Sequence, residues 1–167
     1  MPLGSVLFAP LLLGYRLGWV NAHFLRARLV RYCVRGLDAK HYAAVGERFA
    51  RETLPPALRP QALERLRWHQ QCGHTVAVVP GALDVYLAHR CRAQQAECLC
   101  SRPEVMDGCL TGRYAGAQCA GEEKARRVRE RYDLARYSEI YAYGDTYEDL
   151  ALLQLAQQRY YRWERMP

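Results

Sequence analysis

The chain has 167 residues, half of them hydrophobic and a quarter charged, which excludes a disordered or fibrous protein and leaves room for one core with a small appended subdomain. Its formal net charge of +7 comes from arginine, since lysine occurs only at positions 40 and 124. No basic stripe interleaved with aromatic residues and no nucleic-acid-binding motif accompanies this charge, so we expect no nucleic-acid partner.

The cysteines indicate the redox environment. Seven occur, an odd number, and none forms a C-x-x-C pair. A disulfide framework is not expected in a chain of this size without a secretory signal, so the cysteine usage favours a reducing, cytoplasmic location.

The first predicted element is an apolar helix from Val6 to Tyr15. Arg16 interrupts it after ten residues, whereas a bilayer span needs about twenty. A signal peptide would carry positive charge ahead of the apolar stretch, and none is present there. The segment suits either a helix packed against its neighbour or a helix that makes a peripheral membrane contact.

Two further helices follow. Phe24, Leu25 and Leu29 recur at helical spacing in a segment that Gly36 ends, and the next helix runs from Asp38, its expected N-cap, to about residue 53. The connector "LPPALRP" at 54–60 is punctuated by proline. We therefore expect a helical cap segment over residues 1–56 and a second domain over residues 57–167.

Helix and strand alternate after this connector. A continuous β-branched run, "HTVAVVP", is typical of a fully buried parallel strand. Alternation of this kind predicts a three-layer, Rossmann-like α/β fold with a parallel sheet between helices. The predicted elements are helices at 61–73, 82–95 and 121–133, strands at 74–80, 96–101, 139–144 and 159–163, and a hairpin at 104–116 that turns at Asp107-Gly108.

The stretch "YAYGDTYEDL" at 141–150 reads as a strand, a tight turn and a helix. Asp145 follows the strand and Asp149 lies one helical turn later, so both carboxylates could face one cation, directly or through water. The alternative is an N-cap, in which Asp145 or Thr146 satisfies free helix amides and the acidic residues complement the helix dipole.

Lys124 begins a helix in "GEEKARRV" and offers the complementary charge. A lysine at one strand end and a carboxylate pair at another suit phosphate chemistry, because the carboxylates hold a divalent cation and the ammonium group offsets the charge of a phosphoryl group. An ordinary helix lysine paired with a neighbouring glutamate is the alternative.

The order and spacing of "DGCLTGRYAGAQCAGEEKARRV" and "YAYGDTYEDLALL" resemble the haloacid dehalogenase-like hydrolase superfamily, in its phosphoserine-phosphatase-like branch (subfamily IB). The resemblance covers nearly the whole chain and implies a Mg²⁺-dependent phosphatase acting on a small phosphorylated substrate or a lipid phosphate. It implies that Asp145 is a metal ligand, that Asp149 is its supporting metal-site carboxylate, and that Lys124 is the catalytic lysine that steadies the phosphoryl group.

The chain departs from the family pattern at the second motif. Pro80 in "VVPGAL" stands where the family has Ser or Thr, and proline has neither a hydroxyl nor an amide hydrogen. The amide of Gly81 could still donate to a phosphate. Gln118 stands where this branch often has Asn, so it could contact the substrate phosphate or cap a turn.

The first family motif, an apolar strand ending in D-x-D, is the larger departure, since no D-x-D occurs in the sequence. We therefore expect an N-terminally truncated member whose central first strand and aspartate nucleophile are missing. The neighbouring strands would then keep unpaired backbone groups, each costing about 1–3 kcal/mol if buried. Catalysis would be impaired or lost; the alternative is a non-catalytic module that binds a phosphate ligand or a partner on the same scaffold.

Overall fold

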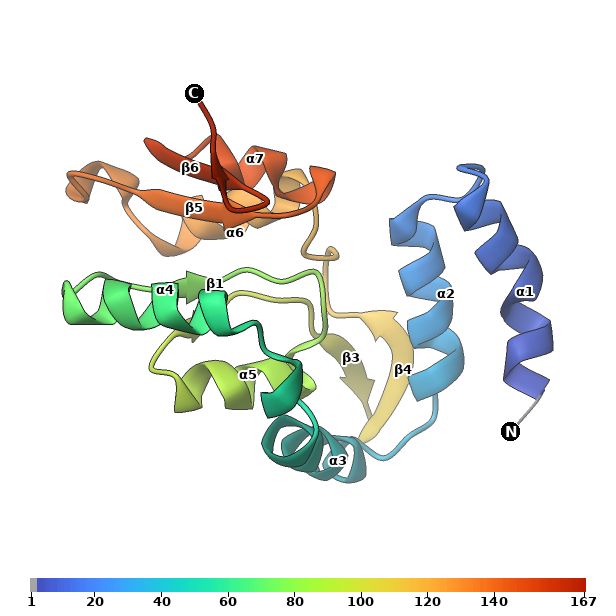
Figure 1. Ribbon diagram of the computed structural model, residues 1–167. Coiled ribbons are helices and arrows are strands. Elements are labelled where there is room, and N and C mark those ends of the chain that lie inside the picture. The colour runs from blue at the N-terminus through green and yellow to red at the C-terminus, as the bar shows by residue number, and fades with distance from the viewer. Residues whose placement is uncertain (1–2) are drawn as a thin grey trace. The chain divides into compact units, whose positions relative to one another are not determined.

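The computed structural model describes residues 3–167, with side chains from Ala9 onward (Figure 1). Contacts between Cα atoms group the chain into two compact units. The first contains residues up to His41 together with Pro103–Ala115, and the second contains Tyr42–Arg102 and Gly116–Pro167. The expected division into residues 1–56 and 57–167 stays a prediction beside this spatial grouping. No helix in the described part of the chain is long and apolar enough to cross a membrane.

The first unit consists of two helices and a hairpin. Helix α2 begins at its N-cap Asn21, whose Oδ1 accepts a hydrogen bond from the amide of Phe24 at 2.8 Å. The hairpin turns at Asp107 and Gly108, both with positive φ, which confirms the predicted Asp-Gly turn. The elements are α1 (Leu3–Arg16), α2 (Ala22–Val34), β3 (Pro103–Met106) and β4 (Cys109–Tyr114).

Helix α3 (Ala39–Glu52) leads from the first unit into the second. Asp38 caps it, because Oδ1 of Asp38 accepts a hydrogen bond from the amide of His41 at 2.7 Å. The N-cap expected at this position is therefore confirmed.

The second unit alternates helices and short strands, which confirms a mixed α/β fold. Its α-helices are α4 (Pro60–Gln71), α5 (Asp84–Ala93), α6 (Glu122–Arg131) and α7 (Leu150–Leu153). Its strands are β1 (Ala77–Val78), β2 (Glu97–Cys98), β5 (Tyr141–Gly144), β6 (Gln158–Tyr161) and β7 (Glu164–Arg165), and its 3-10 helices are Pro55–Ala57, Leu134–Arg136 and Tyr147–Asp149.

The sheets are smaller than the sequence predicts. Strand β1 pairs in parallel with β2, while β5 pairs in parallel with β6, and β7 continues that sheet antiparallel. Within the described residues these are separate sheets, and neither β1 nor β5 has a second strand partner. The sequence predicts a parallel sheet without its central strand, and the segments 74–80 and 139–144 indeed do not pair with each other, but the strands form two short separate sheets. A strand extends only as far as a partner satisfies its backbone groups, and β1 has one partner over two residues.

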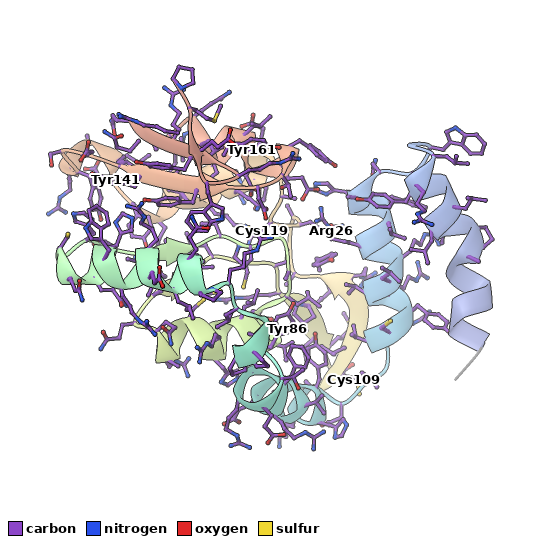
Figure 2. The ribbon with its side chains drawn as sticks, viewed as in Figure 1. Arg26, Tyr86, Cys109, Cys119, Tyr141 and Tyr161 are labelled. Carbon is purple, nitrogen blue, oxygen red and sulfur yellow. The ribbon has the colours of Figure 1, made fainter. Side chains whose placement is uncertain are left out.

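Helix α4 lies against β5 through an aromatic cluster. The buried ring of His69 has its Nε2 3.0 Å from the hydroxyl of Tyr143 and its Nδ1 2.8 Å from Nδ1 of His74. Figure 2 shows Tyr141 between β5 and α4, where its ring centroid lies 5.7 Å from that of Trp68. These contacts fix the C-terminal end of α4 on the strand that leads to Asp145.

The two histidines must share a proton. Their Nδ1 atoms lie 2.8 Å apart and their ring centroids 5.1 Å apart, so the two lone-pair directions are close to collinear. One proton between the rings makes a hydrogen bond, whereas a proton on both facing nitrogens makes a repulsion. Burial, and then the charges of His74 and Arg65, lower the pKa of His69. The folded chain therefore resists protonation of this ring.

We expect the free energy of unfolding to fall as the pH decreases below about 6.5, the pKa of histidine in an unfolded chain. The unfolded state binds a proton there that the folded state, with the lower His69 pKa, does not bind. Thermal unfolding at about pH 7.5 and about pH 5.5 measures the difference.

His69→Phe keeps the aromatic packing and should flatten this pH dependence. His41→Gln, on the exposed surface of α3, serves as the control and should keep the slope of the unaltered chain. An unchanged slope in His69→Phe would show that other groups cause the pH dependence.

Candidate functional site

A buried ion pair between Lys124 and Asp149 lies at the centre of the candidate site. Nζ of Lys124 is 2.5 Å from Oδ1 of Asp149, and the two side chains are 7% and 10% exposed. Lys124 stands in the first turn of α6, and Asp149 ends the 3-10 helix Tyr147–Asp149. The amide of Gly121, the N-cap of α6, donates to the carbonyl of Glu148 at 3.1 Å. The start of α6 is thus fixed to the segment that follows β5.

The second carboxylate oxygen of Asp149 organises the turn after β5. Oδ2 accepts hydrogen bonds from the amides of Asp145 at 3.2 Å and Thr146 at 3.0 Å, and from the hydroxyl of Thr146 at 2.8 Å. Burial opposes ionisation of Asp149, but the hydrogen bonds from Lys124 and Thr146 outweigh it, so its pKa is lowered. The capping alternative holds in part: Thr146 is the N-cap residue, but the side chain that accepts hydrogen bonds from these backbone amides is that of Asp149, not that of Asp145 or Thr146.

Gly144 permits this arrangement because it has no side chain. A Cβ atom at this position would collide with Cβ of Asp149 and lie 3.0 Å from its Cγ. Neither atom belongs to the flexible end of a long side chain, so Asp149 would have to leave its place. The glycine before Asp145 is thus required by close packing.

Asp145 stays at the surface beside this buried pair. Its side chain is 48% exposed, and its Oδ2 lies 3.2 Å from Nη1 of Arg59. Its backbone carbonyl accepts a hydrogen bond from Nε of Arg162 at 3.3 Å. Asp145 therefore has two arginines beside it, one at its carboxylate and one at its carbonyl.

Sequence reasoning missed both arginines. Arg59 belongs to the "LPPALRP" connector, which predicted only a boundary, and it is the N-cap residue of α4. The proline after it, Pro60, starts α4 at N1. A proline at the first position of a helix was the local sequence signal that Arg59 belongs to a helix end and not to a flexible linker.

The donor set fits a magnesium ion in part. Mg²⁺ prefers oxygen ligands and is usually held by one or two carboxylates together with waters and substrate phosphate. Asp145 provides one accessible carboxylate once Arg59 moves aside, whereas both oxygens of Asp149 already accept hydrogen bonds. Among the described side chains, no three of His, Cys, Asp or Glu converge as a metal-ion cluster. The assignment of both aspartates to a metal stays a prediction.

The predicted substrate-binding residues lie on other loops of the same unit. Pro80 and Gly81 follow β1, and Gly81 stands in the bend before α5. Gln118 belongs to the loop between β4 and α6, which is anchored where Arg127 donates to the carbonyl of Ala117 at 2.7 Å. The structure therefore brings Lys124, Asp145 and Asp149 together, while the roles of Gly81 and Gln118 stay predictions.

The chain matches a known protein family over most of its length. A model of the haloacid dehalogenase-like hydrolases matches residues 4–154. Protein CicA of Caulobacter vibrioides is 29% identical over 150 residues, which cover 85% of this chain and 64% of CicA. The chain thus spans less than two thirds of the length of this curated relative.

Solved structures give the same fold. A protein of unknown function from Bordetella pertussis Tohama I matches with a TM-score of 0.80 and 26% identity, over 92% of this chain and 71% of that one. A probable phosphoserine phosphatase from Vibrio cholerae matches with a TM-score of 0.70 and 18% identity, over 92% of this chain and 46% of that one.

We expect Asp149→Asn to lower the free energy of unfolding by about 3–5 kcal/mol, because it leaves the buried ammonium group of Lys124 without its counter-charge. Urea unfolding followed by circular dichroism measures the loss. Arg126→Ala is the control, since it removes an exposed ion pair with Glu123 and should change stability little.

Gly144→Ala should produce a comparable loss by displacing Asp149 instead of neutralising it. If Asp149→Asn were as stable as the unaltered chain, the buried pair would not hold these segments together.

Proposed function

The chain belongs to the haloacid dehalogenase-like hydrolase family, and from that premise we propose that it carries the magnesium- and phosphate-binding part of a phosphomonoesterase site. The observation that supports this proposal most directly is the buried Lys124–Asp149 pair with the exposed carboxylate of Asp145 beside it. A buried lysine and an accessible carboxylate on adjoining turns are the charges that a phosphate bound with a divalent cation requires.

Each residue has a distinct proposed role. The ammonium group of Lys124 has three donors, of which Asp149 uses one, so the others can face a phosphoryl oxygen. Asp149 holds Lys124 and the amide of Asp145 in place and so supports the metal site indirectly. Asp145 is the direct magnesium ligand, and magnesium bound there would neutralise charge on phosphate oxygens.

The amide of Gly81 and the side chain of Gln118 are the proposed phosphate contacts from the neighbouring loops. Pro80, which lies between β1 and Gly81, contributes no backbone hydrogen-bond donor. We propose a small phosphorylated molecule as the substrate class, with a lipid phosphate as the alternative. One solved structural neighbour is described as a probable phosphoserine phosphatase, which supports the first of these.

The nucleophile distinguishes two versions of the proposal. Phosphoryl transfer through an aspartyl phosphate needs a carboxylate in line with the phosphorus, and the 167 residues contain no D-x-D. We propose that this chain by itself binds magnesium and phosphate but hydrolyses phosphate esters poorly, and that β1 and β5 are the strands between which a central strand would complete the sheet. The second candidate is a non-catalytic module that binds a phosphate ligand or a partner protein; the exposed but arginine-paired Asp145 favours it.

Isothermal titration with magnesium chloride tests the metal site. We expect the unaltered chain to bind Mg²⁺ and Asp145→Asn to lose this binding. Arg59→Gln should strengthen binding by up to about 5-fold, because it removes a competing cation from an exposed ion pair worth at most about 1 kcal/mol. Arg51→Gln, which removes a similarly exposed arginine paired with Glu52, is the matched control and should leave the affinity unchanged.

Equal magnesium affinity in the unaltered chain and in Asp145→Asn would place the metal elsewhere. If Arg59→Gln bound magnesium with the same affinity as the unaltered chain, the ion pair between Arg59 and Asp145 would not compete with the metal in solution.

Phosphate release from p-nitrophenyl phosphate separates the two versions. We expect the rate constant to lie roughly 10⁴-fold or more below the 1–10³ s⁻¹ of typical enzymes, because a nucleophile is lacking. Magnesium-dependent binding of inorganic phosphate should nevertheless be measurable by the same titration. If the chain released phosphate at an ordinary enzymatic rate, and Asp145→Asn abolished this release, the proposal that catalysis is impaired would be wrong. Binding of neither magnesium nor phosphate would leave partner binding as the function.

A further inference from the structure

From Ala9 onward, where its side chains are described, the outer face of α1 is largely apolar and exposed to solvent. Figure 1 shows α2 between α1 and β4, and α1 packs along α2. Gly14 is buried, and Leu11 is partly buried, on the inner side. Leu12, Leu13 and Tyr15 are exposed on the remaining surface, and Leu13 is 58% exposed. A helix that is apolar on its solvent side as well as its packed side is not typical of a water-soluble surface.

The turn after α1 extends this apolar surface. Leu17 is 52% exposed and Trp19 is 81% exposed. Gly18, with φ of +76°, lets the chain reverse between them. Tryptophan with tyrosine beside exposed leucines is the composition found where a protein meets the boundary between lipid headgroups and acyl chains.

Positive charge accompanies the apolar surface without acidic residues. No Asp or Glu occurs from residue 9 to residue 37, whereas five arginines do. Arg28 and Arg31 of α2 and its C-cap residue Arg35 recur at helical spacing with exposed side chains, beside the line where Gly112 of β4 packs on the backbone of Arg31. Arg28 lies over the ring of Phe24 at 4.9 Å.

The acidic residues of the unit are Asp38, Glu104 and Asp107, against six arginines and one lysine. Asp38 caps α3 through the amide of His41. Glu104 accepts hydrogen bonds from Thr111 and Arg113 on the hairpin. The surface that carries the arginines of α2 therefore has a net positive potential that complements an anionic surface.

We propose that the α1–α2 hairpin is a docking surface for a membrane that contains anionic phospholipid. The leucines of α1 and Trp19 enter the boundary of the headgroups, and the arginines of α2 contact lipid phosphates. Helix α1 has 14 residues and is about 21 Å long, less than the roughly 30 Å of a hydrocarbon core, so it lies in the plane of the surface. This inference rests on the first unit and is independent of the proposed phosphatase site.

A membrane accounts for both halves of the surface better than the alternatives. A nucleic acid would use the arginines and leave the leucines in water, because it offers no apolar phase. A second copy of this chain would bring the same arginines face to face with one another. A bilayer surface offers an apolar layer and a negatively charged layer side by side.

Sedimentation of the full chain with vesicles tests the proposal. Vesicles of phosphatidylcholine with phosphatidylglycerol should bind the chain, and vesicles of phosphatidylcholine alone should bind it much more weakly. Binding should weaken as salt increases, because charge contributes to it. The fluorescence of Trp19 should shift to shorter wavelength on binding, and Trp19→Phe should lose that part of the shift.

Two double variants separate the apolar and charged contributions. Leu12→Asn with Leu13→Asn should weaken the partition coefficient at least about 10-fold, because exposed apolar area is lost. Arg28→Gln with Arg31→Gln should weaken it about 30-fold on anionic vesicles, from a factor of about five for each charge. Arg129→Gln with Arg136→Gln, both exposed in the second unit, removes the same charge elsewhere and should leave partitioning within about 2-fold.

Circular dichroism confirms that each variant keeps its fold, since all the changed side chains are exposed. Full binding by both α1 and α2 double variants would overturn the proposal. So would a dimer, measured by light scattering, that Leu12→Asn with Leu13→Asn dissociates while no vesicle binds. Arginine-dependent binding to an RNA oligonucleotide without vesicle binding would also overturn it.

Discussion

The buried pair of Lys124 and Asp149 is the constraint on which the rest of the site depends. Removing two charges from water carries a large desolvation cost, which only good geometry and further hydrogen bonds can offset. Here the carboxylate receives Lys124 on one oxygen and two backbone amides and a hydroxyl on the other. The pair therefore joins the start of α6 to the turn after β5, and the turn places Asp145 outside.

The exposure of Asp145 is a consequence of this division of labour. One carboxylate is buried and satisfied by protein groups, so it cannot readily bind a cation. The other carboxylate is exposed and pairs with Arg59, and water screens the attraction between these two charges. A carboxylate held by a weak, exposed ion pair can exchange an arginine for a metal at low cost, which a buried pair cannot do. The two aspartates, four positions apart, therefore lie in different electrostatic environments.

Helix α4 connects this chemistry to the fold. Its C-terminal end is fixed on β5 by the His69 ring and the hydroxyl of Tyr143. Its N-terminal end carries Arg59 to the carboxylate of Asp145. Helix α4 is therefore held at one end by strand β5 and at the other by the turn that follows this strand.

The two sheets explain why α4 has this role. Strands β1 and β5 do not pair with each other among the described residues, so no continuous ladder of backbone hydrogen bonds joins the two halves of the second unit. Side chains have to supply part of the connection, and the cluster of His69, His74 and Tyr143 is one such link. Local order in this unit depends more on side-chain contacts than in a protein with a complete sheet.

The sequence by itself determined the features that depend on neighbours within a few positions. The cap at Asp38, the turn at Asp107-Gly108 and the positive φ of Gly36 and Gly73 after their helices are of this kind, because a cap or a turn closes on residues two to four positions away. The grouping of Asp145 with Asp149 was also local. Lys124 was placed at the same site from its position at a strand end and from spacing that resembles a family, whereas its ion pair with Asp149 is seen only in the tertiary structure.

Only the tertiary structure decided the features that need a distant partner. The lengths of β1 and β2 were set by the few residues that found each other, not by the longer apolar runs. The bond between His69 and Tyr143 spans 74 positions, and Arg59 reaches Asp145 across the unit. A local sequence pattern does not predict such long-range contacts, because a strand pair or an ion pair contributes energy only when folding brings both partners together.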